Sequence, residues 1–151
     1  MVIMKKLILY VATIFALTCA VSCKKDDKKV DYKSSIVGEW HCSPEAFDAD
    51  VYVAFNAEGG FDLYQQIGEG RHRHYTGTYS IEGNTLSGTY TDGNPWGSTY
   101  SMEFVSDKEM KLTALNGSNE VMSYFKEDIP AEVRDNAVDT KSIEDVDCPV
   151  L

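Results

Sequence analysis

Between residues 36 and 126, short runs of β-branched and aromatic residues alternate with clusters of Gly, Asn and Asp. Such runs are typical of β-strands, and the clusters between them are typical of tight turns. No stretch inside this region keeps the periodicity of an amphipathic helix. We therefore predict eight strands, over residues 36–42, 50–56, 61–67, 72–81, 85–91, 98–105, 109–115 and 120–126.

Most of the predicted strands follow one another through short connections, which favours an antiparallel meander. The pair Asn116-Gly117 is the strongest hairpin signal among these connections. Eight strands suffice to close such a sheet into a barrel that is packed or holds one small ligand. We predict an all-β fold, an eight-stranded antiparallel up-and-down barrel. An open meander or a two-sheet sandwich is the alternative that periodicity leaves open.

Residues 1–22 have the layout of a secretory signal peptide. Lys5 and Lys6 precede an apolar run over residues 7–20, which is shorter than the about 20 residues that a spanning helix needs. The run ends at Ala20-Val21-Ser22-Cys23, which resembles the bacterial lipobox, in which the cysteine is lipidated. We predict a lipoprotein signal peptide over residues 1–22 and a lipid anchor at Cys23. The alternatives are lipidation at Cys19 or a plain signal peptide.

Residues 23–34 are predicted to be a charged flexible linker, because the run Lys24-Lys25-Asp26-Asp27-Lys28-Lys29 is too charged to pack. A lipidated cysteine followed by lysine and aspartate also resembles the export signal of Bacteroidetes-type lipoproteins. We therefore expect an outer membrane lipoprotein that is exposed at the cell surface. A plain linker, with the domain facing the periplasm, is the other interpretation.

The charge balance argues against one class of partner. The chain carries 14 basic and 24 acidic residues, a net charge of −10, and most of this excess lies in the predicted barrel and tail. Because binding to nucleic acid requires a basic face for the phosphates, we predict no nucleic-acid partner.

Two cysteines remain once Cys19 and Cys23 are assigned to the signal region and the anchor. They are Cys42, on the first predicted strand, and Cys148, in an acidic tail over residues 128–151. In an oxidising compartment two thiols favour a disulfide, although strict geometry decides whether it forms. The alternative is that Cys42 and Cys148 remain free thiols. In the same tail, Pro130 suits the first turn of a short helix over residues 129–135.

A family resemblance rests on three short motifs. Gly38-Glu39-Trp40 matches the lipocalin G-x-W motif, and residues 76–80 and 83–90 resemble the G-T-Y and G-N-T-L runs of bacterial lipocalin-like lipoproteins. The chain resembles this family over residues 35–127. The resemblance implies a barrel whose closed end is plugged by Trp40, with a basic residue packed over the ring. Lys126 is the candidate for that residue, although the family pattern has Arg there. The resemblance implies ligand binding in general and no particular ligand.

Strand alternation places an aromatic interior behind Trp40, because side chains two apart share one face. Such an interior is typical of a pocket for a small apolar or amphipathic molecule. Arg73 is a candidate partner for a ligand carboxylate, and an exposed Trp96 with Tyr100 is a candidate stacking platform for sugar or peptide. The alternative is that the rings simply fill the core. The candidate ligand-binding residues are Phe55, Leu63, Gln65, Arg73, Tyr75, Tyr79, Tyr90, Trp96, Tyr100 and Met102.

Neither metal binding nor catalysis has a matching motif. His72 and His74 share one face of a strand and could meet His41, but that face is opposite to Tyr75 and is expected to face solvent. No G-x-S-x-G, H-E-x-x-H or Gly-rich phosphate loop occurs. We therefore predict no metal, no cofactor and no enzymatic activity. The expected partners are the membrane and a small apolar ligand. A protein or glycan partner bound through the loops is the alternative.

Overall fold

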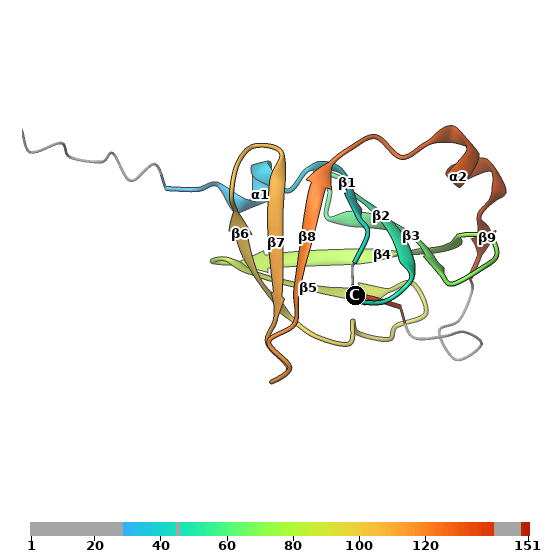
Figure 1. The fold of residues 1–151 in the computed structure, drawn as a ribbon. Helices are drawn as coiled ribbons and strands as arrows, with labels where there is room; N and C mark the ends of the chain where they lie inside the picture. Colours follow the sequence, from blue (N-terminus) through green and yellow to red (C-terminus); the bar gives the residue numbers. More distant parts are fainter. Residues whose placement is uncertain (1–28, 45, 141–148) are drawn as a thin grey trace, which may run out of the picture.

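The computed structural model describes residues 29–44, 46–140 and 149–151, and its eight main strands close into one antiparallel barrel (Figure 1). Each strand pairs with the next in the chain, and the last pairs with the first. The predicted eight-stranded up-and-down barrel is confirmed. The strands are β1 (Gly38–Cys42), β2 (Ala49–Phe55), β3 (Gly60–Ile67), β4 (Arg73–Glu82), β5 (Thr85–Tyr90), β6 (Tyr100–Phe104), β7 (Glu109–Ala114) and β8 (Val121–Lys126).

Three short elements lie outside the barrel. Helix α1 (Tyr32–Ser35) precedes β1, within the stretch predicted to be a linker, and its N-cap Asp31 accepts a hydrogen bond from the Ser34 amide. Helix α2 (Ala131–Asn136) begins after Pro130, close to its predicted place. Strand β9 (Val138–Asp139), which was not predicted, pairs parallel with β4. Among the described residues, no helix is long and apolar enough to cross a membrane.

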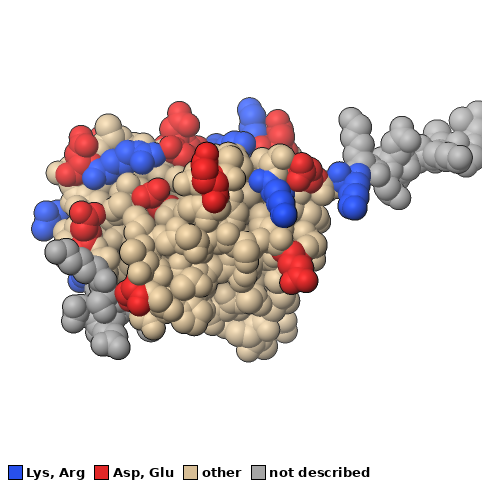
Figure 2. Space-filling view, turned by 180° about the vertical axis from the view of Figure 1, so that it is seen from behind, with Lys and Arg blue, Asp and Glu red and all other residues tan. Residues whose placement is uncertain are grey.

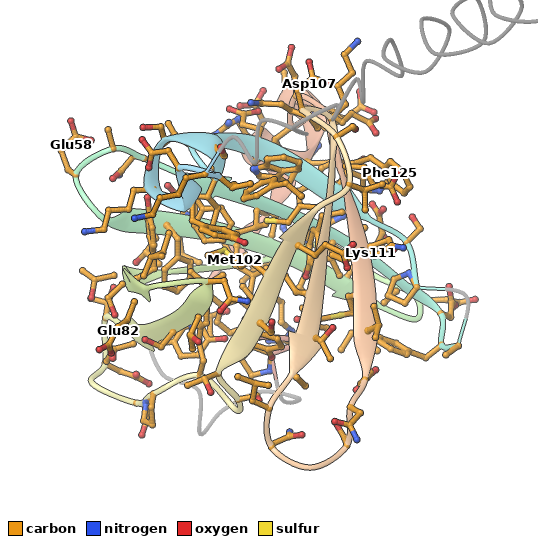
Figure 3. All side chains as sticks on the ribbon, turned by 90° about the vertical axis from the view of Figure 1, so that its left-hand side faces the viewer. Glu58, Glu82, Met102, Asp107, Lys111 and Phe125 are labelled. Carbon is orange, nitrogen blue, oxygen red and sulfur yellow. The ribbon has the colours of Figure 1, made fainter. Side chains whose placement is uncertain are left out.

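Side chains alternate between a packed interior and the outer surface of the barrel. Met102 points inward and is buried, whereas Lys111 and Phe125 lie outside (Figure 3). Seen from behind, acidic and basic side chains are interspersed along the upper part of the barrel and form no continuous basic patch on that face (Figure 2).

Trp40 plugs one end of the barrel, as the resemblance implies. The residue is fully buried, and its indole Nε1 donates a hydrogen bond of 2.8 Å to the main-chain oxygen of Ile36. The Nζ atom of Lys126 lies 5.3 Å from the centroid of the Trp40 ring. Lysine therefore takes the place of the expected basic residue over the plug.

The backbone conformation and a close neighbour explain why the first residue of the G-x-W motif is glycine. Gly38 has a φ of +135°, and a Cβ atom on it would lie 2.9 Å from Cε of Lys126. A side chain at this position would be strained and would push away the lysine that covers Trp40. Gly38 therefore allows Lys126 to reach the ring.

The seam that closes the barrel is narrow. Strands β1 and β8 are in register only through Trp40 opposite Lys126 and His41 opposite Phe125. By comparison, β1 and β2 pair over five positions and β2 and β3 over seven. The barrel is therefore closed by a short pairing, and the β5–β6 pairing, also over two positions, is as short.

A second, smaller core lies on the outside of β2 and β3. Tyr52 and Tyr64 project outward from these strands and are buried beneath Ile129 and Val133, which come from the segment containing α2. Strands β2 and β3 are therefore covered on both faces, by the barrel interior and by the C-terminal segment.

Candidate functional site at the open end of the barrel

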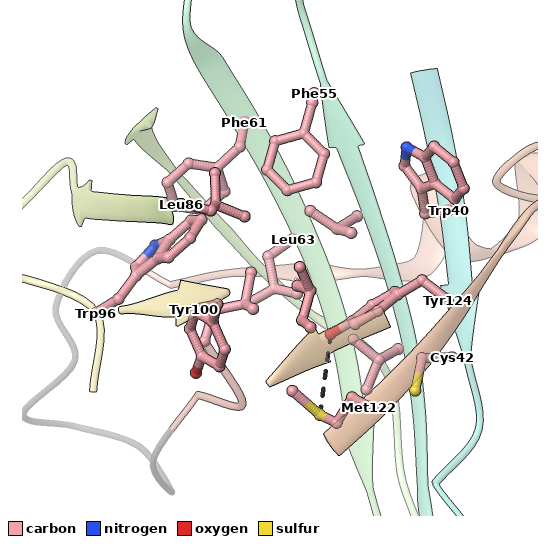
Figure 4. Packing of buried hydrophobic residues seen from close by; sticks show 14 of the residues in the cluster. Trp40, Cys42, Phe55, Phe61, Leu63, Leu86, Trp96, Tyr100, Met122 and Tyr124 are labelled. Carbon is pink, nitrogen blue, oxygen red and sulfur yellow. Dashed lines mark hydrogen bonds between the residues drawn. The ribbon is translucent and has the colours of Figure 1, made fainter. Parts of the chain in front are cut away.

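A hollow of about 330 Å³ lies at the end of the barrel opposite Trp40. Figure 4 shows the two ends, with Trp40 on one side of the core and Tyr100 on the other. The wall of the hollow includes Ile67, Ala114 and Met122, which come from the ends of three strands. The wall combines apolar side chains with the polar Ser98, Asn116 and Glu120, and residues 149–151 form part of it.

Residues 149–151 lie across this opening and bind to it through their main chain. The Tyr90 hydroxyl donates a hydrogen bond of 2.7 Å to the main-chain oxygen of Leu151. The Tyr100 hydroxyl donates one of 3.1 Å to the oxygen of Val150, and the Val150 amide donates one of 2.7 Å to Oε1 of Gln65. Leu151 is 1% exposed and belongs to the interior cluster. The tail thus completes the core at the open end.

The two tyrosine hydroxyls at this site are neutral hydrogen-bond donors. Burial raises the pKa of Tyr100 to about 12, with a further contribution from the charge of Glu120. Burial also raises the pKa of Tyr90. Because both groups stay protonated over the physiological range, they suit an uncharged or anionic oxygen as acceptor.

The candidate ligand-binding residues separate into two groups. Gln65, Tyr90 and Tyr100 meet at the tail. The remaining candidates whose side chains point inward lie elsewhere: four are in the packed core and one is near the Trp40 end. Phe55, Leu63, Tyr75 and Met102 are buried in the interior cluster, and the Tyr79 hydroxyl donates a hydrogen bond to the main-chain oxygen of Asn56, after β2.

Arg73 lies at the rim of the barrel and is exposed, not in the interior where alternation placed it. It is the first residue of β4 and is paired in register with Gln65, so the barrel wall ends beside it. Together with Gln65, Ile67 and Val138 it borders a second hollow of about 270 Å³. A guanidinium group at this rim is held in water and does not line the buried core.

Trp96 is buried, contrary to the expectation of an exposed stacking platform. It is 5% exposed, and its ring packs edge-on against Phe61 at a centroid distance of 5.1 Å. The ring lies over Gly88, where an added Cβ atom would be 2.2 Å from Cε2 of the indole. A glycine inside a strand is a signal of such close approach, and that signal in β5 was available in the sequence.

The three histidines lie on the outer face of the barrel, where alternation placed them, and form part of a row of rings. His41, Tyr52, Tyr64 and His74 are successive register partners across β1 to β4. His41 stacks on Tyr52 at 4.3 Å, and His74 stacks on Tyr64 at 4.4 Å. Within the described part of the chain, no group of three His, Cys, Asp or Glu residues is arranged to hold a metal ion.

These histidines hold the C-terminal segment to the barrel through carboxylates. His74 lies between Asp62 of β3, at 2.8 Å from Nε2, and Asp139 of β9, at 2.8 Å from Nδ1. His41 similarly lies between Asp50 and Glu127. A neutral imidazole donates from one nitrogen only, so the contact of His74 with two carboxylates favours the protonated form of that ring. The hydrogen bond with Asp62, supported by Asp139, raises the pKa of His74 despite its partial burial.

The stability that His74 contributes is expected to fall as the pH rises. A raised folded-state pKa means that this contribution is complete below the unfolded-state value of about 6.5 and is lost as the pH passes the folded-state pKa. Thermal unfolding of the wild type and of His74→Gln should therefore differ more at about pH 5 than at about pH 9. Asp139→Asn, which removes the negative charge beside Nδ1 of His74, should reduce this pH dependence. A gap between wild type and His74→Gln that does not change with pH would contradict the role of the charge.

Cys42 is buried, and its predicted partner Cys148 lies outside the described residues, as does the predicted anchor Cys23. Cys42 forms no disulfide with any described residue. Burial raises the pKa of its thiol to about 11. The thiol therefore stays protonated at neutral pH, and this suits a packing role better than a nucleophilic one.

Comparisons with known proteins agree with this architecture. The barrel is similar to an NMR structure of a protein from Bacteroides uniformis ATCC 8492, with a TM-score of 0.51, 19% identity, and coverage of 64% of this chain and 93% of that one. A crystal structure of an uncharacterized protein from Bacteroides eggerthii DSM 20697 gives a TM-score of 0.44, 18% identity, and coverage of 61% and 99%. At 19% identity the similarity to the Bacteroides uniformis protein concerns the fold alone.

The family assignment rests on sequence. No curated protein matches the chain. The family model described as a lipocalin-like domain matches residues 22–112, which is more than half of the chain and includes the G-x-W motif and the first six strands. Barrels of this kind bind ligands in general, and the family is generally non-enzymatic. The chain belongs to the lipocalin-like domain family.

Proposed function

We propose that the protein is a lipid-anchored lipoprotein of the outer membrane whose barrel binds a small apolar or amphipathic ligand at its open end. The observation that carries the binding part is the hollow of about 330 Å³ beside Tyr100. Its size is within the range of small-molecule sites, and its lining combines apolar walls with a few polar groups, as such sites do.

The polar groups define how a ligand would be oriented. Tyr100 lines the hollow, and Tyr90 and Gln65 contact the tail beside it, so a ligand that took the place of the tail would meet two hydroxyl donors and one amide oxygen. The walls offered by Ile67 and Met122 suit a hydrocarbon part. A molecule with an apolar body and one oxygen-bearing end therefore fits the site better than a sugar or a metal ion.

Filling the hollow is expected to weaken binding. Ala114 lines it and is 5% exposed, so Ala114→Phe should place a ring in the space. The probe is dodecanoate, a simple amphipathic molecule, and native mass spectrometry measures its binding. We expect it to bind the wild type detectably and to bind Ala114→Phe at least about tenfold more weakly. Thr113→Phe puts the same ring on the outer face of β7 and is the matched control. Equal binding by all three proteins would place the ligand elsewhere.

The anchor part of the proposal rests on the lipobox-like sequence ending at Cys23. Cys23→Ala should move the protein from the membrane fraction to the soluble fraction, because the acyl chains supply the attachment at about 0.8 kcal/mol per buried CH₂ group. Cys19→Ala changes the neighbouring cysteine and should leave the protein with the membranes. Immunoblots of the two fractions measure this, and a membrane-bound Cys23→Ala protein would refute the anchor.

The alternative function, a module that binds a protein or glycan through its loops, was suggested by an exposed aromatic platform. Because Trp96 is buried against Phe61 and Gly88, that platform does not form. The ligand site at the open end is therefore the better supported of the two.

A further inference from the structure

The way residues 149–151 are held says what kind of molecule the open end recognises. A chain end that merely covers an apolar surface makes contact through its side chains. Here three main-chain groups of the tail, the Val150 amide and the oxygens of Val150 and Leu151, each form a hydrogen bond to a side chain of the barrel. Recognition of main-chain groups, with side chains in apolar pockets, is how proteins bind peptides.

The three side chains come from different strands and converge from the inside of the wall. Gln65 is on β3, Tyr90 on β5 and Tyr100 on β6. All three are buried, and Gln65 is 2% exposed in an interior that is otherwise apolar. A buried amide is stable only when it is hydrogen-bonded. Its Oε1 accepts a hydrogen bond from the Val150 amide, so Gln65 contacts a main-chain N–H at the position of residue 150.

The opening is larger than the tail that occupies it. The hollow of about 330 Å³ lies beside residues 149–151, and the hollow of about 270 Å³ lies beside Gln65. Ile67 borders both. A ligand that displaced the tail would therefore find space on two sides of the position that Val150 occupies.

We propose that residues 149–151 act as an internal ligand of the open end, that the site recognises a short apolar peptide, and that an external ligand binds by displacing the tail. This inference rests on the proposed function and names its ligand class and its regulation. Since the tail belongs to the same chain, its effective concentration at the site is high, and it lowers the apparent affinity for any competitor.

Two full-length variants should release the tail by different means. Leu151→Asp puts a charge where the side chain is 1% exposed. Val150→Pro removes the amide that donates to Gln65 and adds no charge. Leu115→Asp makes the same change as the first variant at a residue that is 51% exposed and serves as the matched control. Far-UV circular dichroism and thermal unfolding check that each variant is folded.

The probe is a fluorescein-labelled peptide with the sequence of residues 147–151, with serine replacing Cys148, and fluorescence anisotropy measures its binding. We expect Leu151→Asp and Val150→Pro to bind it at least about tenfold more tightly than the wild type and Leu115→Asp do. Adding Tyr100→Phe or Gln65→Leu to either tail variant should reverse this gain. A scrambled peptide should bind none of them.

A parallel titration with dodecanoate separates this inference from the proposed function. If the tail variants bind dodecanoate and not the peptide, the peptide class is wrong and ligand binding stands. If the wild type binds both probes as tightly as the tail variants do, the tail is no competitor. If folded tail variants bind neither probe, both the inference and the proposed function fail.

Discussion

Replacing Trp40 with alanine is expected to lower the free energy of unfolding by about 3–5 kcal/mol, the usual range for a large buried aromatic residue. The residue is fully buried at the closed end of the barrel. Its loss removes the hydrogen bond to Ile36 and leaves Lys126 without the ring beneath it. Urea denaturation followed by far-UV circular dichroism measures the change.

Phe125→Ala is the matched control for the Trp40 prediction, because it also removes a ring near the β1–β8 seam. Phe125 is 52% exposed, and its truncation should change stability by less than about 1 kcal/mol. If Trp40→Ala were as mild as Phe125→Ala, the indole would not be a structural plug, and the role that the G-x-W motif implies would be wrong.

Gly88→Ala is expected to destabilise the barrel by about 1–3 kcal/mol, the usual cost of overpacking a filled core. The new Cβ atom would lie 2.2 Å from the indole of Trp96, which is itself packed against Phe61. The ring has to move, and the connection between β5 and β6 moves with it, since the Trp96 amide donates a hydrogen bond to the main-chain oxygen of Gly88. Thermal and urea unfolding measure the effect.

Gly97→Ala tests the same change beside the tryptophan, where an added Cβ meets no atom within 4 Å. Its effect should be within about 0.5 kcal/mol of zero. Gly88→Ala and Trp96→Leu combined should cost less stability than the sum of their separate effects, because a smaller side chain leaves room for the methyl group. Additive effects of these two changes would show that the ring and the glycine are not coupled.

The strands could be predicted from the sequence because their signals are local. Alternation and turn residues lie within each segment, so β7 and β8 appear within one residue of the predicted ends. The burial of the outer face of β2 could not be predicted in this way, because the contact of Tyr52 with Ile129 joins distant parts of the chain.

The site could be predicted in part for the same reason. Inward parity placed Gln65, Tyr90 and Tyr100 correctly on the interior face, but nothing in the local pattern indicated that Val150 and Leu151 return to them. The prediction that Trp96 is exposed was wrong. Its position between turn residues suggested exposure, whereas the glycine at position 88 provides the space that buries it.

The narrow β1–β8 seam has a consequence for how the chain folds. The other antiparallel pairings join strands that are neighbours in sequence or close to it, whereas the seam joins Trp40 to Lys126 across nearly the whole barrel sequence. Closing so long a loop loses chain entropy for only two register pairs. Hairpins can therefore assemble before the ends meet, and closure becomes the slow, late event typical of non-local β topologies. Until then Trp40 has no lysine over it, so the covering of its ring marks the moment at which the sheet becomes a barrel.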